Sequence, residues 1–492
     1  MAKTLSILFV SSEVCPFVKV GGIADVTFSL PLAIRDIGHD IRVMIPKYGC
    51  VSERKNRIHE INRLRDVAIP IGNSEELATI KSSSINNPRV KVQAYITTNT
   101  KYFDSKKGVY DNIKNNKPYS DNDERFLFFN RSVIETCLLL GWFPDIIHCN
   151  DWQAALIPAY ARLMHPGKFK KTKFVFTIHN ISQQGVFPES TFQKLSMPNE
   201  VKDNFIHKKN FNFLKAGLVY SDYLTTVSPS YAEEILNDNK LSNGLNSIVQ
   251  ANAGKFEGIL NSIDPWGWNP KTDINISKKY TTNFEDYKLT NKQAVLKKFK
   301  LEYKPETPLI AMINRIDEQK GIPLFIEAAD KLLAEDIQIM MLGEGDADMK
   351  NKLTEIAKKY PKKFAVKFAF DEPLAHLMEA GSDIYLMPSL SEPCGLNAMY
   401  SILYGSIPIV HTTGGLKDII IESGNDTKKG NGFVFKTYKA ADMIKAVQKV
   451  LALYSKREEW NTYVQEVMKS SFSWKVSAAK YDEIYRSLLK EV

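Results

Sequence analysis

The sequence lacks the marks of several protein classes. Cysteine is scarce and scattered, at Cys15, Cys50, Cys137, Cys149 and Cys394. No Cys-x-x-Cys pair occurs, which argues against a zinc site or a disulfide framework and favours a reducing setting. No apolar run approaches the roughly 20 residues that cross a bilayer, and Leu5–Val10 is too short for the core of a secretory leader. We therefore expect a cytoplasmic protein with no membrane partner.

Basic tracts that alternate with aromatic residues are also missing, so nucleic acid is not expected as a partner. The net charge of +9 fits either an anion-binding cleft or a solvated surface. Hydrophobic residues make up 44% of the chain and charged residues 25%, which is typical of a globular protein with a large core. A length of 492 residues predicts two or three domains.

Short apolar runs alternate with amphipathic stretches along the whole chain, which predicts α/β domains with parallel, doubly wound sheets. The strands expected in the first half are 7–10, 41–45, 90–95, 146–148, 174–178 and 223–227. A second set follows at 309–313, 337–342, 365–370, 384–387 and 407–410. Amphipathic helices are expected at 30–37, 123–140, 152–162, 323–334 and 347–360, with the interdomain linker near 256–270. Ligands bind at the carboxyl ends of strands in such sheets, so the motifs that follow strands are candidates for function.

Glycine pairs follow a strand in both halves. Lys19-Val-Gly-Gly22 precedes a helix in the first half, and Thr413-Gly414-Gly415 follows the last predicted strand of the second. Both suit a phosphate held by backbone N–H groups at a helix start. The alternative for each is a plain turn that needs glycine for a positive φ.

Charged residues follow two further strands of the second half. Arg315 and Lys320 follow strand 309–313, where they suit a diphosphate leaving group, or else are surface cations with acidic partners. Glu392 follows strand 384–387 and suits sugar hydroxyls or developing positive charge, or else caps a helix. Cys394 is expected to pack rather than react, because the motif contains no base.

Polar residues also end two strands of the first half. Asp151-Trp152 follows strand 146–148, and His179-Asn180 follows strand 174–178. Asp and His can bond sugar hydroxyls, and Trp can stack on an apolar sugar face. These residues lack metal-ligand spacing, so no metal site is predicted.

The ordered set of motifs resembles the bacterial glycogen synthases and plant starch synthases of glycosyltransferase family five. The resemblance covers nearly the whole chain, from Ile7-Leu-Phe-Val-Ser-Ser-Glu13 to Phe472-Ser-Trp474. The stretches that carry it are Lys19–Val26, Phe176–Asn180, Phe213–Gly217, Thr226–Pro229, Gln319–Gly321, Glu392–Leu396 and Thr413–Leu416.

This resemblance implies a GT-B fold, in which two Rossmann-like domains face a deep interdomain cleft. It places the first domain at 1–258, the second at 259–473, and a C-terminal segment, 474–492, that returns to the first. The implied reaction transfers glucose from ADP-glucose, or in some members UDP-glucose, to the nonreducing end of an α-1,4-glucan or maltooligosaccharide. The anomeric configuration is retained, and neither metal nor cofactor is needed.

The same resemblance assigns roles to individual residues. His179, Arg315, Lys320 and Glu392 are the expected catalytic residues. Donor binding is expected from Lys19, Gly22, Phe370, Cys394, Gly395, Leu396, Thr413, Gly414 and Gly415, with Phe370 where the family often stacks a Tyr on adenine. Glucose or acceptor contacts are expected from Asp25, Tyr110, Asp151, Trp152 and Asn180.

Four positions depart from the family pattern. Phe28 stands in place of a small Gly, Ser262 in place of Gly, Ala398 in place of Gln, and His411 where bacterial members often carry Arg. Two alternatives stay open: another retaining GT-B transferase with a different acceptor, and a non-catalytic glucan-binding relative. The intact set of cations and the carboxylate argues against the second.

Overall fold

The computed structural model describes residues 3–113, 117–423 and 429–490, which fall into two compact units. Unit 1 holds the described residues up to Val227, then Ala232–Asn261 and those from Trp474 onward. Unit 2 holds Ser228–Tyr231 and Ser262–Ser473. Ser228–Tyr231, around the first turn of a helix that continues in unit 1, form a short excursion into unit 2. The main crossings lie between Asn261 and Ser262, against the expected 258 and 259, and between Ser473 and Trp474.

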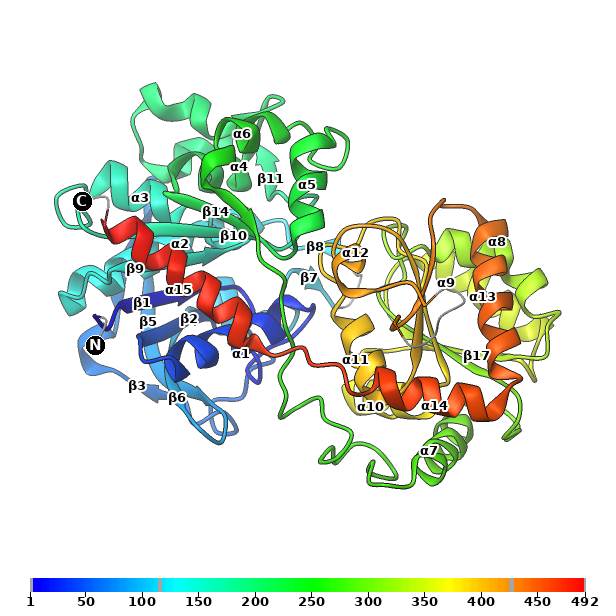
Figure 1. Cartoon of the computed structure of the whole chain (residues 1–492). Coiled ribbons are helices and arrows are strands. Elements are labelled where there is room, and N and C mark those ends of the chain that lie inside the picture. Colours follow the sequence, from blue (N-terminus) through cyan, green and yellow to red (C-terminus); the bar gives the residue numbers. More distant parts are fainter. Residues whose placement is uncertain (1–2, 114–116, 424–428, 491–492) are drawn as a thin grey trace. The chain divides into compact units, whose positions relative to one another are not determined.

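Unit 1 is built on a mixed sheet whose strand order is β15-β14-β10-β9-β1-β2-β6-β5-β3, with β4 paired to β5 (Figure 1). The stretch from β15 to β6 is parallel, and the edge strands β5, β4 and β3 pair antiparallel. The strands are β1 (Ser6–Val10), β2 (Asp40–Pro46), β3 (His59–Glu60), β4 (Val67–Ile71), β5 (Ser74–Asn86), β6 (Lys91–Thr98), β9 (Ile146–Asn150), β10 (Lys173–Ile178), β14 (Tyr223–Thr226) and β15 (Phe256–Gly258). The helices are α1 (Ile23–Asp36), α2 (Asn122–Leu140), α3 (Ile157–Met164), α4 (Phe213–Tyr220), α5 (Pro229–Asn237), α6 (Asn246–Ala251) and α15 (Trp474–Lys490).

Unit 2 contains a parallel sheet with the order β18-β17-β16-β19-β20-β21. The strands are β16 (Leu309–Ile313), β17 (Gln338–Gly343), β18 (Phe364–Phe368), β19 (Ile384–Met387), β20 (Ile407–His411) and β21 (Phe433–Phe435). The helices are α7 (Phe284–Phe299), α8 (Ile322–Leu332), α9 (Ala347–Lys359), α10 (Glu372–Gly381), α11 (Leu396–Tyr404), α12 (Leu416–Ile419), α13 (Ala440–Tyr454) and α14 (Arg457–Val467). Two Rossmann-like α/β units confirm the predicted fold class.

The C-terminal helix α15 belongs to unit 1, where it packs beside α1 (red and dark blue in Figure 1). The Tyr485 hydroxyl lies 2.7 Å from Nδ1 of His148, at the centre of the unit-1 sheet. The Asp482 carboxylate lies 2.8 Å from Nε2 of His39, just before β2. Two polar contacts to buried histidines thus fix the helix on unit 1.

The irregular segment of unit 2 between Ser262 and helix α7 is held in place by its aromatic and acidic side chains. The Trp268 ring stacks on the rings of His376 and Tyr400, with centroid distances of 3.7 and 3.8 Å. The buried Asp273 carboxylate accepts a 2.5 Å hydrogen bond from the Tyr404 hydroxyl and lies 2.6 Å from Nδ1 of His376. The segment is therefore a packed part of unit 2.

The structure differs from the sequence prediction at several elements. Helix α1 begins at Ile23, directly after the Gly21-Gly22 pair as expected, and so extends further toward the N-terminus than the amphipathic stretch 30–37. The expected helix at 152–162 is a 3-10 turn (Trp152–Ala154) followed by α3. Strand β18 ends at Phe368, so Phe370 lies in a loop and not in the strand. The β4–β5 hairpin was not predicted. Across the described residues, no helix is long and apolar enough to cross a membrane.

Candidate active site

Three neighbouring strands of unit 2 bring their following loops to one edge. Arg315 and Lys320 follow β16, Glu392 follows β19, and Thr413 follows β20. Because β16, β19 and β20 are adjacent and parallel, these loops lie side by side at the carboxyl edge of the sheet. The structure thus gathers the charged candidates of the second half.

The Glu392 side chain, only 8% exposed, is held by one of its oxygens. Its Oε2 accepts a 2.7 Å hydrogen bond from Nζ of Lys320 and a 3.0 Å bond from the Ser389 hydroxyl. No described protein group donates to Oε1. The second carboxylate oxygen is therefore available to a ligand.

The Arg315 guanidinium is fixed from one side. Its Nε donates to Asp317 at 2.8 Å and one terminal nitrogen, Nη2, donates to Gln319 at 3.0 Å. Asp317 also accepts a 2.9 Å bond from the backbone N–H of Lys320. The alternative of surface cations with acidic partners thus describes Arg315, whose side chain is 44% exposed, but not Lys320, whose side chain is 18% exposed and whose partner is itself a candidate residue.

Two turns that contain glycine, at 394–396 and 413–415, pack against each other beside Glu392. The N–H of Gly415 donates to the Glu392 carbonyl at 2.9 Å, and a Cβ at Gly415 would lie 2.3 Å from the Cys394 carbonyl oxygen. Gly395 and Gly414 have φ values of +99° and +46°, so both are in the left-handed region. Tight packing and backbone conformation therefore require these glycines.

Three other donor-site candidates lie around the same edge. Cys394 and Thr413 are both 6% exposed, and Leu396 begins α11. Phe370, in contrast, is 63% exposed in the loop before α10. Its ring makes no contact with another described aromatic ring, so a flat apolar surface faces solvent.

In unit 1 the loop between β1 and α1 holds the first glycine pair. Nζ of Lys19 lies 2.8 Å from the Asp25 carboxylate, one turn into α1. Neither Gly21 nor Gly22 has a positive φ, so the turn-conformation alternative is wrong here. A Cβ built at Gly21 would meet nothing within 4 Å. The fold itself does not require glycine at position 21, and the space above it is open.

One backbone donor of that loop is already committed. The N–H of Gly21 donates to the Glu13 carboxylate at 3.0 Å, and that of Val20 donates to the same oxygen at 2.5 Å. The expectation that both glycine N–H groups face a phosphate therefore fails for Gly21. The N–H groups of Gly22 and Ile23 come next at the start of α1, where a helix leaves its donors unsatisfied.

The His179 ring is oriented by Asn150, the last residue of β9. Nδ2 of Asn150 donates to the Val10 carbonyl at 3.0 Å, which directs its Oδ1 toward Nε2 of His179 at 2.9 Å. A carbonyl oxygen only accepts, so Nε2 carries the ring proton. Burial lowers the pKa of His179 to about 3, which keeps the ring neutral. Nδ1 is then an acceptor to which none of the described groups donates.

Asp151 supports the same turn from a strained backbone position with φ +55°. Its Oδ1 accepts hydrogen bonds from the N–H groups of His179 at 2.7 Å and Asn180 at 3.4 Å. Burial raises the pKa of Asp151 to about 7, although these two bonds act against the shift. Asp151, His179 and Asn180 thus form one connected cluster.

The structure gives Trp152 a packing role, in place of the sugar stacking that the sequence predicted. Trp152 is 8% exposed, and its ring packs against Phe126, Phe187 and Phe213. A Cβ at Gly185 would lie 2.4 Å from the ring. With its surroundings filled, Trp152 stabilises the loop that carries Asp151.

Tyr110 lies beside the Lys19 loop. Its hydroxyl donates to Oε1 of Glu13 at 2.6 Å and lies 2.7 Å from the Ser12 hydroxyl. Sequence reasoning missed Glu13, Asn150 and Ser389 as site residues. The available signal was position, because Glu13 and Ser389 closely follow β1 and β19 and Asn150 ends β9.

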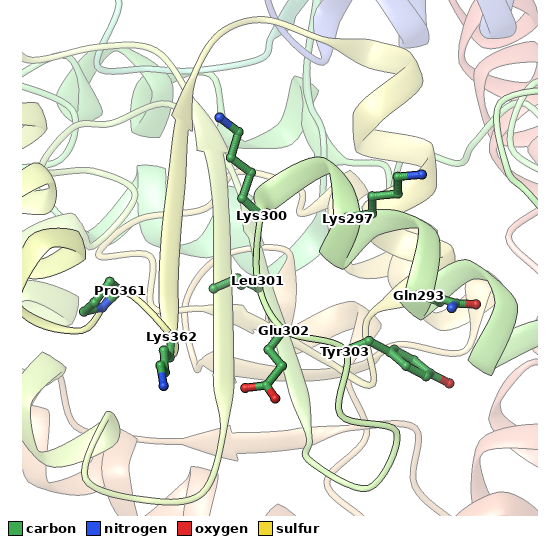
Figure 2. Close-up of a pocket in the computed structure, with 8 residues that line it drawn as sticks. All are labelled: Gln293, Lys297, Lys300, Leu301, Glu302, Tyr303, Pro361 and Lys362. Atoms are coloured by element: carbon green, nitrogen blue, oxygen red, sulfur yellow. The ribbon is translucent and has the colours of Figure 1, made fainter.

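A depression of about 590 Å³ in unit 2 lies away from these clusters (Figure 2). It borders the end of α7 and the segments before β16 and β18, so it is at the amino edge of the sheet. Figure 2 shows the Lys362 amino group pointing away from those of Lys297 and Lys300, so the three cations do not converge on one anion. The remaining lining residues are Gln293, Leu301, Glu302, Tyr303 and Pro361. Among the described residues, no group of three or more His, Cys, Asp or Glu is placed to bind a metal.

Comparison with protein families matches both halves of the chain. A model described as the starch synthase catalytic domain matches residues 6–251. A second, described as glycosyl transferases group 1, matches residues 295–467. Together they span the candidate residues of both units.

Relatives match over the full length. The glycogen synthase of Chlorobaculum parvum is 37% identical over 490 residues, and that of Pelodictyon phaeoclathratiforme is 38% identical over 492 residues, each alignment covering 99% of both chains. The catalytic domain of starch synthase IV from Arabidopsis thaliana, solved with ADP and acarbose, superposes with a TM-score of 0.90 at 29% identity, covering 99% of this chain and 100% of that one. Sucrose-phosphate synthase from Thermosynechococcus elongatus, at 16% identity and a TM-score of 0.59, shares the fold alone.

Proposed function

Because this chain belongs to the starch synthase catalytic-domain family, whose full-length relatives here are glycogen synthases, we propose that it uses ADP-glucose to extend the nonreducing end of an α-1,4-glucan. Its membership makes it a glycosyltransferase that passes glucosyl units to a glucan. The similarity to a starch synthase that binds ADP and acarbose supports an adenine nucleotide and an oligosaccharide as ligands.

The ion pair between Lys320 and Glu392 is the observation that carries the proposal. A cation and a buried carboxylate lie 2.7 Å apart at the carboxyl edge of the unit-2 sheet. When the bond between a sugar and a diphosphate breaks, negative charge grows on the diphosphate and positive charge on the sugar ring. Lys320 and Glu392 supply one fixed charge for each, and such preorganised charges are a large source of rate enhancement.

The donor is held by the other groups at that edge. Arg315 joins Lys320 in binding the diphosphate, because its second terminal nitrogen, Nη1, has no described protein partner. The turn formed by Thr413, Gly414 and Gly415 lies against the phosphates, with the N–H of Gly415 bound to the Glu392 carbonyl and with Cys394, Gly395 and Leu396 packed beneath the turn. The exposed Phe370 ring stacks on the adenine.

Unit 1 contributes to the same reaction from its own loops. Lys19 and the N–H of Gly22 bind donor phosphate oxygens. Nδ1 of His179 accepts a hydrogen bond from a glucose hydroxyl, with Asn180 beside it. Asp25 and Asp151 contact the glucose or the acceptor, and Tyr110 contacts the acceptor. Both units therefore carry residues that the proposed reaction uses.

The chemistry follows from the absence of an assigned protein nucleophile beside the sugar. The bond between the anomeric carbon and the β-phosphate oxygen breaks as the acceptor 4-hydroxyl attacks from the same face. The hydroxyl proton passes to the departing diphosphate, and the anomeric configuration is retained. The positive charges of Arg315 and Lys320 serve the leaving group, so no metal or cofactor is required by this scheme.

The test is incubation of the purified chain with ADP-glucose or UDP-glucose and either glycogen or maltooligosaccharide. Nucleotide release and chain extension are measured together, with and without EDTA. We expect extension with ADP-glucose that EDTA does not reduce. Extension with UDP-glucose alone would overturn the donor assignment, and nucleotide release without extension would point to a different acceptor.

A matched pair of variants links the activity to the site. Glu392→Gln removes the buried carboxylate charge, and Glu355→Gln makes the same change at an exposed position on α9. We expect Glu392→Gln alone to abolish most chain extension. Equal activity of the two variants would remove Glu392 from the proposed mechanism.

A further inference from the structure

Glu13 is a buried carboxylate that accepts three hydrogen bonds from two separate segments of unit 1. Glu13 is only 2% exposed and lies three positions after the end of β1. Oε2 accepts from the N–H groups of Val20 and Gly21, and Oε1 accepts from the Tyr110 hydroxyl. Burying a carboxylate is unfavourable unless its oxygens are well bonded, and here both oxygens are.

Its two sets of partners flank the groups assigned to the two substrates. Val20 and Gly21 lie between Lys19 and Gly22, which are assigned to the donor phosphates. Tyr110, 97 positions along the chain from Glu13, is assigned to the acceptor side. The Glu13 side chain thus bonds both to the loop assigned to the donor and to the tyrosine assigned to the acceptor.

The bonds also fix directions. The Tyr110 hydroxyl has one proton, which goes to the Glu13 carboxylate, so the Ser12 hydroxyl must donate to the Tyr110 oxygen at 2.7 Å. The Tyr48 hydroxyl in turn donates to the Ser12 carbonyl at 3.0 Å. The position of the Tyr110 hydroxyl is therefore determined from two sides.

At the other end, Glu13 decides which amides of the loop stay available. With the N–H groups of Val20 and Gly21 bound to Oε2, the next donors at the start of α1 belong to Gly22 and Ile23. The open space above Gly21 lies on this same turn. The carboxylate therefore occupies two donors of this turn, while the N–H groups of Gly22 and Ile23 have no described protein acceptor.

We propose that Glu13 is a positioning residue for glucosyl transfer, which holds the Lys19–Gly22 loop and the Tyr110 hydroxyl in fixed relation to each other. It acts through these groups and does not itself touch either substrate. The inference rests on the proposed roles of Lys19, Gly22 and Tyr110.

The chemistry of the carboxylate suggests variants that separate its two ends. In Glu13→Gln the single carbonyl oxygen can keep the bonds from Val20 and Gly21, while the NH₂ group then faces Tyr110 and reverses the polarity of that contact. In Glu13→Asp the charge remains, but the shorter side chain cannot reach both segments. The first variant disturbs the Tyr110 end, and the second disturbs both.

The experiment measures kcat and the two KM values, for ADP-glucose and for maltooligosaccharide, in Glu13→Gln, Glu13→Asp, Tyr110→Phe and the double variant Glu13→Gln/Tyr110→Phe. Glu75→Gln, an exposed glutamate on β5, is the matched control, and thermal unfolding shows that each variant is folded. We expect Glu13→Gln and Tyr110→Phe each to raise the acceptor KM about tenfold, the scale of one lost bond to a charged group. The double variant should be no worse than either single variant, because both remove the same contact. Glu13→Asp should raise both KM values.

The outcomes distinguish a failure of the proposed role of Tyr110 from a failure of the proposed role of Glu13. If Tyr110→Phe leaves the acceptor KM unchanged, Tyr110 does not bind the acceptor and that part of the proposed function fails. If Tyr110→Phe raises the acceptor KM but the effects of the two substitutions multiply in the double variant, Glu13 does not act through Tyr110. Wild-type KM values in a folded Glu13→Asp variant would overturn the positioning role as a whole.

Discussion

Asn150 Oδ1 accepts a 2.9 Å hydrogen bond from Nε2 of His179 and so sets the tautomer of that ring. The amide cannot reverse its direction without losing the bond from its Nδ2 to the Val10 carbonyl. Asn150, at the end of β9, therefore orients His179, which follows the neighbouring strand β10, so that Nδ1 is an acceptor to which no described group donates.

Replacing Asn150 should lower activity more than stability. In Asn150→Ala the His179 ring loses its orienting acceptor, and we expect kcat/KM for ADP-glucose to fall by about 10- to 100-fold, as for other small misplacements of reacting groups. Asn212→Ala is the control, since it removes the helix-capping bond of α4 and should lower the unfolding free energy by about 1 kcal/mol with little change in activity. Similar losses of kcat/KM in both variants would mean that Asn150 acts only through stability.

Glu392→Ala should reduce turnover even when the donor is saturating. The substitution removes the negative charge beside Lys320 and the free oxygen Oε1, and loss of one such electrostatic group lowers kcat by about 100-fold or more. The measurement is the initial rate of ADP release at saturating ADP-glucose. Near-normal turnover would show that the sugar does not depend on Glu392.

Phe370→Ala should change donor binding and leave the chemical step intact. A ring that is 63% exposed contributes little to the core, so the unfolding temperature should not change. Stacking on a base is worth about 1–3 kcal/mol, so we expect the KM for ADP-glucose to rise by about tenfold with kcat unchanged. Phe370→Tyr should restore the wild-type KM, whereas a kcat defect in Phe370→Ala would place this side chain nearer to the reaction.

Asp151 should make the protein less stable as the pH rises from about 4 to about 7. Burial raises the pKa of its carboxyl from 3.8 to about 7, so in this range the folded chain retains a proton that the unfolded chain has released. The folded state binds more protons, and the contribution of this group to the free energy of unfolding therefore falls with increasing pH and levels off above about 7.

The comparison with Asp151→Asn isolates that effect, because the amide oxygen can still accept from the N–H groups of His179 and Asn180 but cannot ionise. We expect the unfolding temperature of Asp151→Asn, relative to wild type, to be higher at pH 8 than at pH 5. A pH-independent difference between the two proteins would mean that Asp151 ionises as readily in the folded chain as in the unfolded one.

Most strands in the parallel parts of the two sheets were predictable because burial on two faces demands continuous apolar sequence, whereas the short parallel edge strands β15 and β21 were missed. Strands β16 and β19 have the predicted bounds, and β1, β2 and β9 differ by one or two residues at an end. Strand β5 was missed because it lies near the edge of its sheet and is largely polar, Ser-Glu-Glu-Leu-Ala-Thr-Ile-Lys-Ser-Ser-Ser-Ile-Asn. Its partner β4 was missed with it.

The site was predictable where a motif is local and unpredictable where it depends on distant contacts. The grouping of Arg315, Lys320 and Glu392 followed from strands that end at one edge. The bond between Glu13 and Tyr110 joins residues 97 positions apart, and nothing in either local sequence marks it. Trp152 was misjudged because its neighbour Phe213 comes from a helix 61 positions further on, and only the fold reveals that the ring is enclosed.

The placement of α15 in unit 1 affects how the chain can fold during synthesis. A ribosome makes unit 2 before it makes α15, so the first unit must wait, with His148 and His39 lacking their Tyr485 and Asp482 partners, until the second has emerged. Nascent unit 1 is thus an incomplete structure with one uncovered face beside α1. Unit 1 can therefore complete its fold only after unit 2 has been translated, so a chain that stops within unit 2 yields neither unit in its finished form.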